Sequence, residues 1–248
     1  MIEVKVPYEV DGRAFEGMIV WDDSIATKRP ILFMQPDWYG IYPETIEQAR
    51  ELAGDRYIVL MADMFGVGAG DGAEAMDFHA LLKRMLGVHK DLDFTLACGG
   101  TAYKVMLTEA ERRGLVDTAA PKFSVGYCAG GGFLMEQARS GEDFDAVVVF
   151  HITNPNPVVP GTPAKFKGRV MAIHGADDPA TTKAMMHEFE DELAAANVDW
   201  QTVMFGGARH AFCVPSAVKF EAMGTRYDEK LCRRSYRMMH DFFAETEA

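Results

Sequence analysis

The sequence predicts one α/β domain over residues 1–248, with a mostly parallel, twisted sheet of about eight strands and helices on both faces. Short apolar segments such as 31–35 and 146–150 alternate with longer helix-like segments, which is the pattern of a parallel sheet covered on both sides. A chain of 248 residues fits one large domain, and no internal repeat or linker divides it.

The expected elements follow in chain order. Residues 2–9 and 14–21 form an antiparallel pair joined by the Asp11-Gly12 turn, a strong hairpin signal. Strands are expected at 31–35, 57–62, 123–127, 146–150, 169–173 and 200–205. Helices are expected at 44–53, at 73–113 with a break near Gly87, and at 133–140, 181–196 and 228–246. The glycine-rich segment 63–72 and the proline-rich segment 154–168 are expected to be loops.

The composition narrows the class of protein. A formal net charge of −12 argues against nucleic acid or an anionic membrane as a partner, because both require a basic surface. The N-terminus has no secretory signal pattern, and no apolar run approaches the roughly 18 residues of a membrane span, so we expect a cytoplasmic protein. The four cysteines have no CxxC or zinc-like spacing and are expected to be reduced thiols: Cys98, Cys128, Cys213 and Cys232.

The segment Gly126-Tyr127-Cys128-Ala129-Gly130 has the pattern of a nucleophile held between a strand and a helix, with cysteine where serine is usual. Its glycines suit a strained turn in which strand and helix approach closely. The N-terminus of the following helix favours a thiolate through its N–H groups and its dipole. For the motif taken alone, a buried structural cysteine is an equally good interpretation.

Two downstream loops offer an acid and a base. Asp177 and Asp178 follow the strand RVMAI, and His210 follows the strand QTVMF. The order of nucleophile, acid and histidine, each after a strand, is the order found in hydrolases with this kind of turn. The remaining histidines show no HxH or HExxH spacing, so neither a metal nor a cofactor is predicted.

These residues resemble the dienelactone hydrolase family of α/β-hydrolases, and the likeness covers nearly the whole chain. The matching stretches are, in order, YEVDGRAFEG, RPILFMQPDWYG, ADMFGVG, GYCAGGG, HGADDP, ARHAF and YDEKLCRRSYRMMHDFF. The family pattern G-x-x-D followed by proline selects Asp178 as the acid. The resemblance implies an α/β-hydrolase fold without a large lid, a thiol ester formed at Cys128, and an oxyanion hole made by the backbone N–H groups of Trp38 and Ala129.

The chain departs from the family pattern at two positions. Asp37 stands where the family usually has a glutamate that interacts with the nucleophile thiol, and its side chain is one methylene shorter. Val214 stands four residues after His210, where the dienelactone enzymes have an arginine that holds the substrate carboxylate. The second departure argues against dienelactone itself as the substrate.

The functional hypothesis is therefore hydrolysis of carboxylic esters or lactones, with His210 as the base for Cys128 and Asp178 fixing the imidazole. Six side chains near strand ends are candidates for a substrate pocket: Tyr39, Tyr42, Met64, Phe65, Arg209 and Phe212. The expected partner is a small-molecule ester or lactone, bound by a monomer or a homodimer.

Three other functions fit parts of the sequence. The same site is compatible with other activated esters, such as phosphate triesters. A cysteine-based redox sensor, as in the glutamine-amidotransferase-like superfamily, fits the turn, but the downstream Asp178 and His210 and the N-terminal hairpin argue against it. A ligand-binding relative without turnover is disfavoured by the complete set of Cys128, Asp178 and His210.

Overall fold

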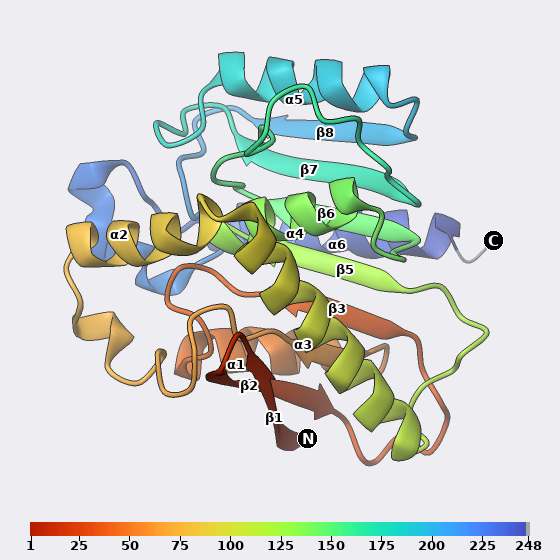
Figure 1. Cartoon of the computed structure of the whole chain (residues 1–248). Helices are drawn as coiled ribbons and strands as arrows, with labels where there is room; N and C mark the ends of the chain where they lie inside the picture. Colours follow the sequence, from red (N-terminus) through yellow and green to blue (C-terminus); the bar gives the residue numbers. More distant parts are fainter. Residues whose placement is uncertain (247–248) are drawn as a thin grey trace.

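The strands form a single eight-stranded sheet in the order β1-β2-β4-β3-β5-β6-β7-β8 in the computed structural model, which describes residues 1–246 (Figure 1). The strands are β1 (Ile2–Val10), β2 (Arg13–Trp21), β3 (Ile31–Gln35), β4 (Ile58–Met61), β5 (Phe123–Tyr127), β6 (Ala146–Phe150), β7 (Arg169–Gly175) and β8 (Trp200–Phe205). β2 is antiparallel to both β1 and β4, and the other neighbouring strands are parallel. The predicted hairpin and mostly parallel sheet are confirmed.

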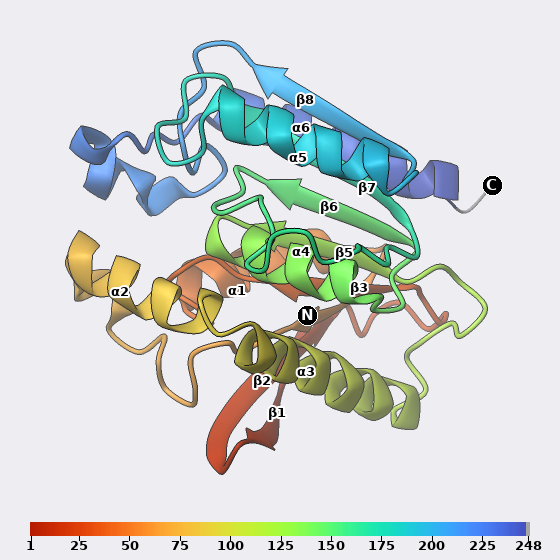
Figure 2. The same ribbon diagram turned by 45° about the horizontal axis from the view of Figure 1, so that its top comes forward.

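Helices cover both faces of the sheet, as predicted. They are α1 (Pro43–Ala53), α2 (Phe78–His89), α3 (Leu92–Arg112), α4 (Ala129–Ser140), α5 (Lys183–Ala195) and α6 (Glu229–Thr246), with short 3-10 helices η1 (Ala73–Ala75) and η2 (Pro215–Met223). Figures 1 and 2 show α3, α4 and α5 on one face, and α1 and α6 behind the other. Each face carries its own hydrophobic cluster, so the sheet is buried on both sides in a single α/β domain without a large lid.

The parallel strands end on the same side of the molecule. In Figure 2 the arrowheads of β6 and β8 point toward the side where α2 and the blue segment containing η2 lie. Loops after parallel strands meet at this edge, which is where open α/β sheets bind their ligands. The fold therefore gathers the loops after β3, β5, β6, β7 and β8 next to α2 and η2.

The structure corrects several predicted helix boundaries. The break in the long helical region lies at Lys90 and Asp91, where the Asp91 carboxylate accepts from the Phe94 N–H and caps α3, while Gly87 lies inside α2. The Asp91 carboxylate begins a new helix at this point, whereas the single exposed Gly87 does not interrupt α2. α4 begins at Ala129, four residues earlier than predicted, and η2 was not predicted.

The expectation of four reduced thiols is wrong for two of them. Cys213 and Cys232 form a disulfide, with Cα atoms 4.8 Å apart, and Cys98 and Cys128 are free and buried. The two half-cystines are 19 residues apart, and the chain between them folds back through η2, so their spacing gave no local signal. The bond joins the loop after β8 to α6.

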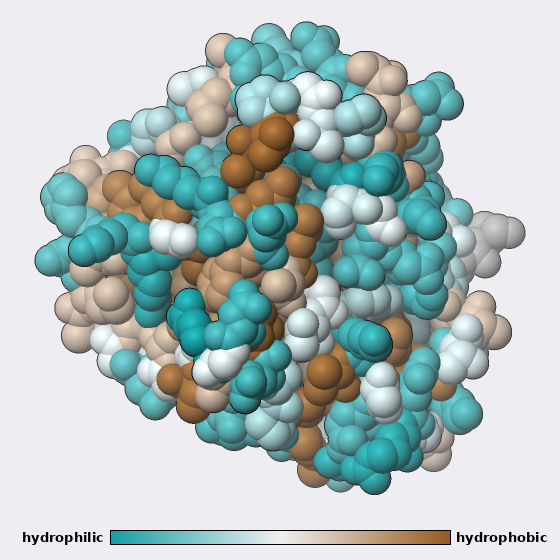
Figure 3. Space-filling model, viewed as in Figure 1, coloured by the Kyte–Doolittle hydropathy of each residue, from teal (hydrophilic) through white to brown (hydrophobic). Residues whose placement is uncertain are grey.

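One face of the molecule is largely hydrophilic (Figure 3). On the face viewed in Figure 3, hydrophilic residues predominate and hydrophobic ones form only small patches. Within residues 1–246, no helix is both long enough and apolar enough to cross a membrane.

Candidate active site

Cys128 occupies a sharp turn between β5 and α4. Its backbone has φ 52° and ψ −116°, a conformation that costs energy in a residue with a side chain. The turn is possible because the residues two positions before and after Cys128 are glycines. At Gly126 a Cβ would lie 2.7 Å from the Gly130 carbonyl oxygen, and at Gly130 it would lie 2.2 Å from the Gln35 and Pro36 carbonyl oxygens. The glycines of the predicted motif therefore bring the helix N-terminus against the sheet, with Cys128 at its tip.

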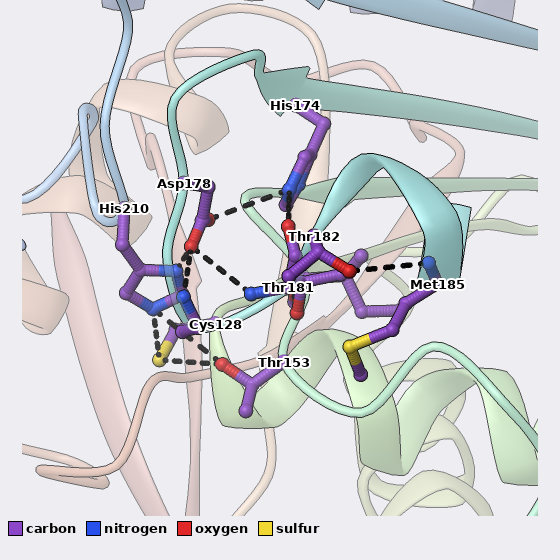
Figure 4. Close-up of polar contacts among 10 residues, drawn as sticks. Cys128, Thr153, His174, Asp178, Thr181, Thr182, Met185 and His210 are labelled. Carbon is purple, nitrogen blue, oxygen red and sulfur yellow. Dashed lines mark hydrogen bonds and ion pairs between the residues drawn. The ribbon is translucent and has the colours of Figure 1, made fainter. Parts of the chain in front are cut away.

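His210 and Asp178 meet Cys128 at the same edge of the sheet. His210 Nε2 lies 3.1 Å from Cys128 Sγ, and His210 Nδ1 lies 2.7 Å from Asp178 Oδ2 (Figure 4). The three side chains come from the loops after β5, β7 and β8, and all three residues are buried. The structure thus brings together the three residues that the sequence predicted as nucleophile, base and acid.

The loop after β7 holds the Asp178 carboxylate in place through backbone hydrogen bonds. Asp178 Oδ1 accepts hydrogen bonds from the N–H groups of Ala180 at 2.7 Å and Thr181 at 3.1 Å, which leaves Oδ2 for His210. His174 Nε2 lies 2.9 Å from the Thr181 carbonyl oxygen and 3.4 Å from Asp178 Oδ2. Asp177, the alternative acid, is exposed. The geometry therefore separates the two aspartates, and only Asp178 reaches the imidazole.

His210 and Asp178 shift each other's pKa toward the charged forms. Burial opposes a charge on His210, but the Asp178 carboxylate and the Cys128 sulfur outweigh it and raise the pKa of His210 well above its ordinary value. Burial likewise opposes a charge on Asp178, and the neighbouring His210 lowers the pKa of that carboxyl. The arrangement favours a charged imidazolium, held between the Asp178 carboxylate and the Cys128 sulfur.

The oxyanion-hole donors predicted from the sequence, the N–H groups of Trp38 and Ala129, are not used in hydrogen bonds within the described part of the chain. The loop holding Trp38 is fixed from behind, since the Arg84 guanidinium donates to the carbonyl oxygens of Trp38 and Ala69 and lies over the Phe65 ring. Such fixed, unused donors are what an oxyanion hole requires.

Asp37 is buried beside the site but does not touch the thiol. Its Oδ1 accepts from the Tyr39 N–H at 2.8 Å, and in the described part of the chain it makes no hydrogen bond to Cys128. Burial raises the pKa of Asp37 to about 7, with a smaller contribution from Glu44, against the attraction of Arg84 and His210. The contact that a family glutamate makes with the thiol is absent here.

Asp37 instead lines a second hollow of about 130 Å³, which we call the acidic cavity. Its carboxylates are Asp37, Glu44, Glu47 and Glu51, and the disulfide partners Cys213 and Cys232 form part of its wall. Tyr42, one of the predicted pocket residues, also lines it, with its hydroxyl 3.3 Å from that of Ser216.

The cavity that contains Cys128 and His210 has a volume of about 210 Å³, and we call it the catalytic cavity. Its other lining residues are Trp38, Phe78, Leu82, Met85, Thr153, Pro179, Ala180, Met223 and Thr225. The rings of Trp38, Phe78 and Phe220 meet edge to face, with centroids 5.4–5.7 Å apart, and so join the loop after β3 to α2 and η2. A larger hollow of about 800 Å³ along β1 and α3 contains none of the predicted site residues.

The six predicted pocket residues lie outside the lining of the catalytic cavity: Tyr39, Tyr42, Met64, Phe65, Arg209 and Phe212. Tyr39, Met64 and Phe212 are buried in the hydrophobic clusters, and Arg209 donates to the Glu221 carbonyl oxygen near the surface. A position after a strand brings the backbone to the correct edge, but it does not fix the direction of the side chain. The prediction relied on backbone position alone, and the direction of the side chains is why these residues lie outside the lining.

α2 and η2 supply the walls that sequence reasoning missed. Phe78, Leu82 and Met85 follow the helical spacing of one face of α2, and this apolar face was the available signal. Met223 and Thr225 carried no comparable signal. Thr153, whose hydroxyl contacts the site, also escaped the sequence analysis. Within residues 1–246, no three His, Cys, Asp or Glu side chains are grouped to hold a metal ion.

This fold and this group of side chains define an α/β-hydrolase. A sequence model of the dienelactone hydrolase family matches residues 15–247, and the chain therefore belongs to that family. The match covers both the nucleophile turn and the loops that carry Asp178 and His210, and it supports an ester hydrolase activity for the chain.

Solved structures agree with this assignment. A dienelactone hydrolase-like promiscuous phosphotriesterase, P91, from metagenomic libraries is 28% identical, with a TM-score of 0.85 over 100% of this chain and 99% of that one. A protein called m3DLH is 30% identical, with a TM-score of 0.88 and the same coverage. Among curated sequences, an uncharacterised protein of Caenorhabditis elegans is 29% identical over 126 residues, or 50% of this chain and 78% of that protein.

Proposed function

We propose that the protein hydrolyses carboxylic esters or lactones through a Cys128-His210-Asp178 triad and a thiol-ester intermediate. The observation that carries the proposal is the continuous chain of contacts from sulfur to imidazole to carboxylate, 3.1 Å and 2.7 Å long, at the wall of one cavity. The proposed chemistry requires no cofactor.

In the first half of the reaction the Cys128 thiolate attacks the ester carbonyl carbon. The developing oxyanion accepts hydrogen bonds from the N–H groups of Trp38 and Ala129. These hydrogen bonds are strongest in the transition state, where the negative charge develops. His210 gives its Nε2 proton to the departing alcohol. In the second half, water loses a proton to His210 and attacks the thiol ester, and the electron pair of the broken C–S bond returns to the sulfur.

The lining of the catalytic cavity supports a neutral, apolar substrate. Apart from Cys128 and His210, the residues that form it are uncharged, and most of them are apolar. Val214, at the position of the family arginine, is buried and packs with Ala211 and Ala217. Among the described residues no lysine or arginine lines the cavity to hold a carboxylate, so an ester with a small apolar acyl group fits better than dienelactone. A thiolate is itself a good leaving group, which favours activated esters over amides.

The proposal is tested by hydrolysis of p-nitrophenyl acetate and butyrate with the wild type, Cys128→Ala and the control Cys98→Ala, which removes the other free buried thiol. We expect turnover to vanish in Cys128→Ala and persist in Cys98→Ala. Intact-mass spectra during turnover should show an acyl adduct on both the wild type and Cys98→Ala, but not on Cys128→Ala. Equal turnover in the wild type and Cys128→Ala, or no turnover in either, would refute the proposal.

A second candidate activity is the turnover of activated phosphate triesters. It is favoured by the likeness over the full chain to a dienelactone hydrolase-like promiscuous phosphotriesterase. The same thiolate, imidazole and N–H donors suit attack on a phosphoryl centre. Paraoxon hydrolysis by the wild type, lost in Cys128→Ala, would establish it, and absence of p-nitrophenol release from paraoxon in an esterase-active preparation would exclude it.

A further inference from the structure

Thr153, in the loop after β6, places a hydroxyl group beside the reacting atoms. Its Oγ1 lies 3.5 Å from Cys128 Sγ and 3.5 Å from His210 Nε2, as Figure 4 shows. Since Sγ and Nε2 are 3.1 Å apart, the three atoms form a nearly equilateral triangle. The first distance is ordinary for a hydrogen bond to sulfur, and the second is at the long limit for one to nitrogen. This hydroxyl takes no part in the proposed attack on the ester or in the proton transfers of His210.

The position of the hydroxyl is held by the fold. The Thr153 N–H donates to the Cys128 carbonyl oxygen at 3.0 Å, so the backbone of the loop is tied to the nucleophile itself. The preceding carbonyl oxygen, of Ile152, accepts from the Thr181 hydroxyl at 2.7 Å, which ties the loop to the segment that holds the acid. His151 has a left-handed φ of 36°, a strained conformation that persists only where its surroundings determine it.

The side chain also faces the place where a substrate reacts. Thr153 is half-buried and lines the catalytic cavity together with Cys128 and His210. The other pocket threonine, Thr225, is differently engaged, because its hydroxyl donates to the Ala217 carbonyl oxygen. Thr153 is therefore the side chain that brings a hydroxyl to both the sulfur and the imidazole.

We propose that the Thr153 hydroxyl is a catalytic group that donates a hydrogen bond to the Cys128 thiolate in the free enzyme and then positions the hydrolytic water in the acyl-enzyme. The inference rests on the proposed function, since it takes Cys128 as the nucleophile.

The change of partner follows from the charge on the sulfur. A thiolate is a charged acceptor and draws the hydroxyl proton, alongside the N–H of His210. After acylation the sulfur of the thiol ester is neutral and a poor acceptor, so the hydroxyl is released. The water that gives its proton to His210 Nε2 must lie within hydrogen-bond reach of that atom, where the Thr153 oxygen is its neighbour.

The bond changes and proton transfers of the proposed reaction are complete without any proton from Thr153. The water oxygen bonds to the thiol-ester carbon, its proton goes to His210 Nε2, and the electron pair of the broken C–S bond returns to Cys128. Thr153 keeps its proton throughout and contributes hydrogen bonds alone.

The test compares Thr153→Val, which removes the hydroxyl at nearly constant shape, with Thr153→Ser, which keeps the hydroxyl and removes the methyl group. The first measurement is the pH dependence of alkylation of Cys128 by iodoacetamide, followed by mass spectrometry. The second is the rate of loss of the acyl adduct after a single turnover of p-nitrophenyl acetate. Melting temperatures of both variants control for folding.

In Thr153→Val we expect the midpoint of the alkylation profile to rise by roughly half a pH unit, and loss of the acyl group to slow roughly fivefold. In Thr153→Ser the midpoint should stay close to that of the wild type, and the rate at which the acyl group is lost should stay within about twofold of the wild-type rate. Wild-type behaviour of Thr153→Val, or equal losses in the two variants, would overturn the inference, because the hydroxyl would then be idle or the methyl group would be the important part. If the wild type forms no acyl adduct, the proposed function fails together with the water-positioning stage, and the alkylation profiles still decide the bond to the thiolate.

Discussion

The catalytic cavity and the acidic cavity begin at adjacent residues of one loop and have opposite chemistry. Trp38 lines the first, of about 210 Å³, and Asp37 lines the second, of about 130 Å³. The first has apolar walls around a cysteine and a histidine, whereas the second has four carboxylates and a disulfide. Two adjacent residues therefore line surfaces of different kinds: Trp38 lines one suited to an uncharged ester, and Asp37 lines one that repels anions.

The difference shows how the fold keeps these four carboxylates out of the cavity in which the proposed reaction would develop negative charge. An oxyanion that develops at the Trp38 and Ala129 N–H groups is destabilised by carboxylates that share its cavity. The acidic cavity holds its carboxylates behind the loop, where they do not line the space beside Cys128. We therefore expect changes on the catalytic side to alter activity, and changes on the acidic side to alter stability.

The largest expected effect is on the catalytic side. Asp178→Asn should reduce kcat/KM for p-nitrophenyl acetate roughly 10³- to 10⁴-fold, because the amide no longer fixes the imidazole or stabilises its charge. Asp177→Asn is the matched control, since Asp177 is the exposed neighbour, and its activity should equal that of the wild type. Steady-state kinetics of the two variants decide the assignment, and a greater loss in Asp177→Asn would reverse it.

On the acidic side, Asp37 should make stability depend on pH. Its folded-state pKa of about 7 lies above the ordinary 3.8, so between these values the folded protein binds a proton that the unfolded chain does not. This contribution is complete below about pH 4 and is lost as the pH rises through 7, by up to about 4 kcal/mol. Urea denaturation from pH 4 to 8 should show this decline in the wild type and a flatter profile in Asp37→Asn. Equal slopes would contradict it.

The disulfide should contribute next most, and again to stability. Cys213 and Cys232 are 19 positions apart in the sequence. A disulfide that closes a loop of this length stabilises a protein by about 3 kcal/mol. Cys232→Ser should therefore melt roughly 6–12 °C below the oxidised wild type, with kcat/KM at 25 °C little changed. Dithiothreitol should lower the melting temperature of the wild type to that of the variant and leave the variant unaffected. A variant that melts like the oxidised wild type would show that the bond contributes nothing.

The smallest expected effect tests the apolar wall. Phe78→Ala should lower kcat/KM for p-nitrophenyl hexanoate roughly tenfold, because a longer acyl chain loses the ring it would bury against, and it should affect the acetate less. Glu51→Gln removes a charge from the acidic cavity and should leave the ratio of the two substrates unchanged. A ratio that moves in Glu51→Gln and not in Phe78→Ala would exchange the roles of the two cavities.

Much of the fold could be predicted because the parallel strands of the sheet interior are short, buried on both faces and mostly apolar, while the edge strand β8 is half-buried and also contains Gln201 and Thr202. The ranges 31–35, 123–127, 146–150 and 200–205 were predicted to the residue. Helix ends were harder, since the break at Asp91 depends on one capping side chain rather than on a periodic pattern. The disulfide was missed because it depends on how η2 folds the chain back, which the spacing of two cysteines does not encode.

The candidate site divides in the same way. Cys128, Asp178 and His210 could be expected to meet because each follows a parallel strand, and the topology brings those loops to one edge. The pocket walls could not, since they depend on where α2 and η2 pack and on which way each side chain points. Thr153 illustrates the limit, because a threonine in a loop is common and only its distances to two particular atoms distinguish it.

Arg84 has a consequence for how such a pocket can diversify. It stands on α2, between the cavity-lining Leu82 and Met85, and its guanidinium holds the carbonyl oxygen of Trp38. The helix proposed to contact the acyl group thus also supports the loop proposed to receive the oxyanion. Substitutions that reshape α2 to admit a new ester will shift the alignment of the Trp38 N–H as well, so selectivity and turnover number are expected to evolve together rather than one at a time.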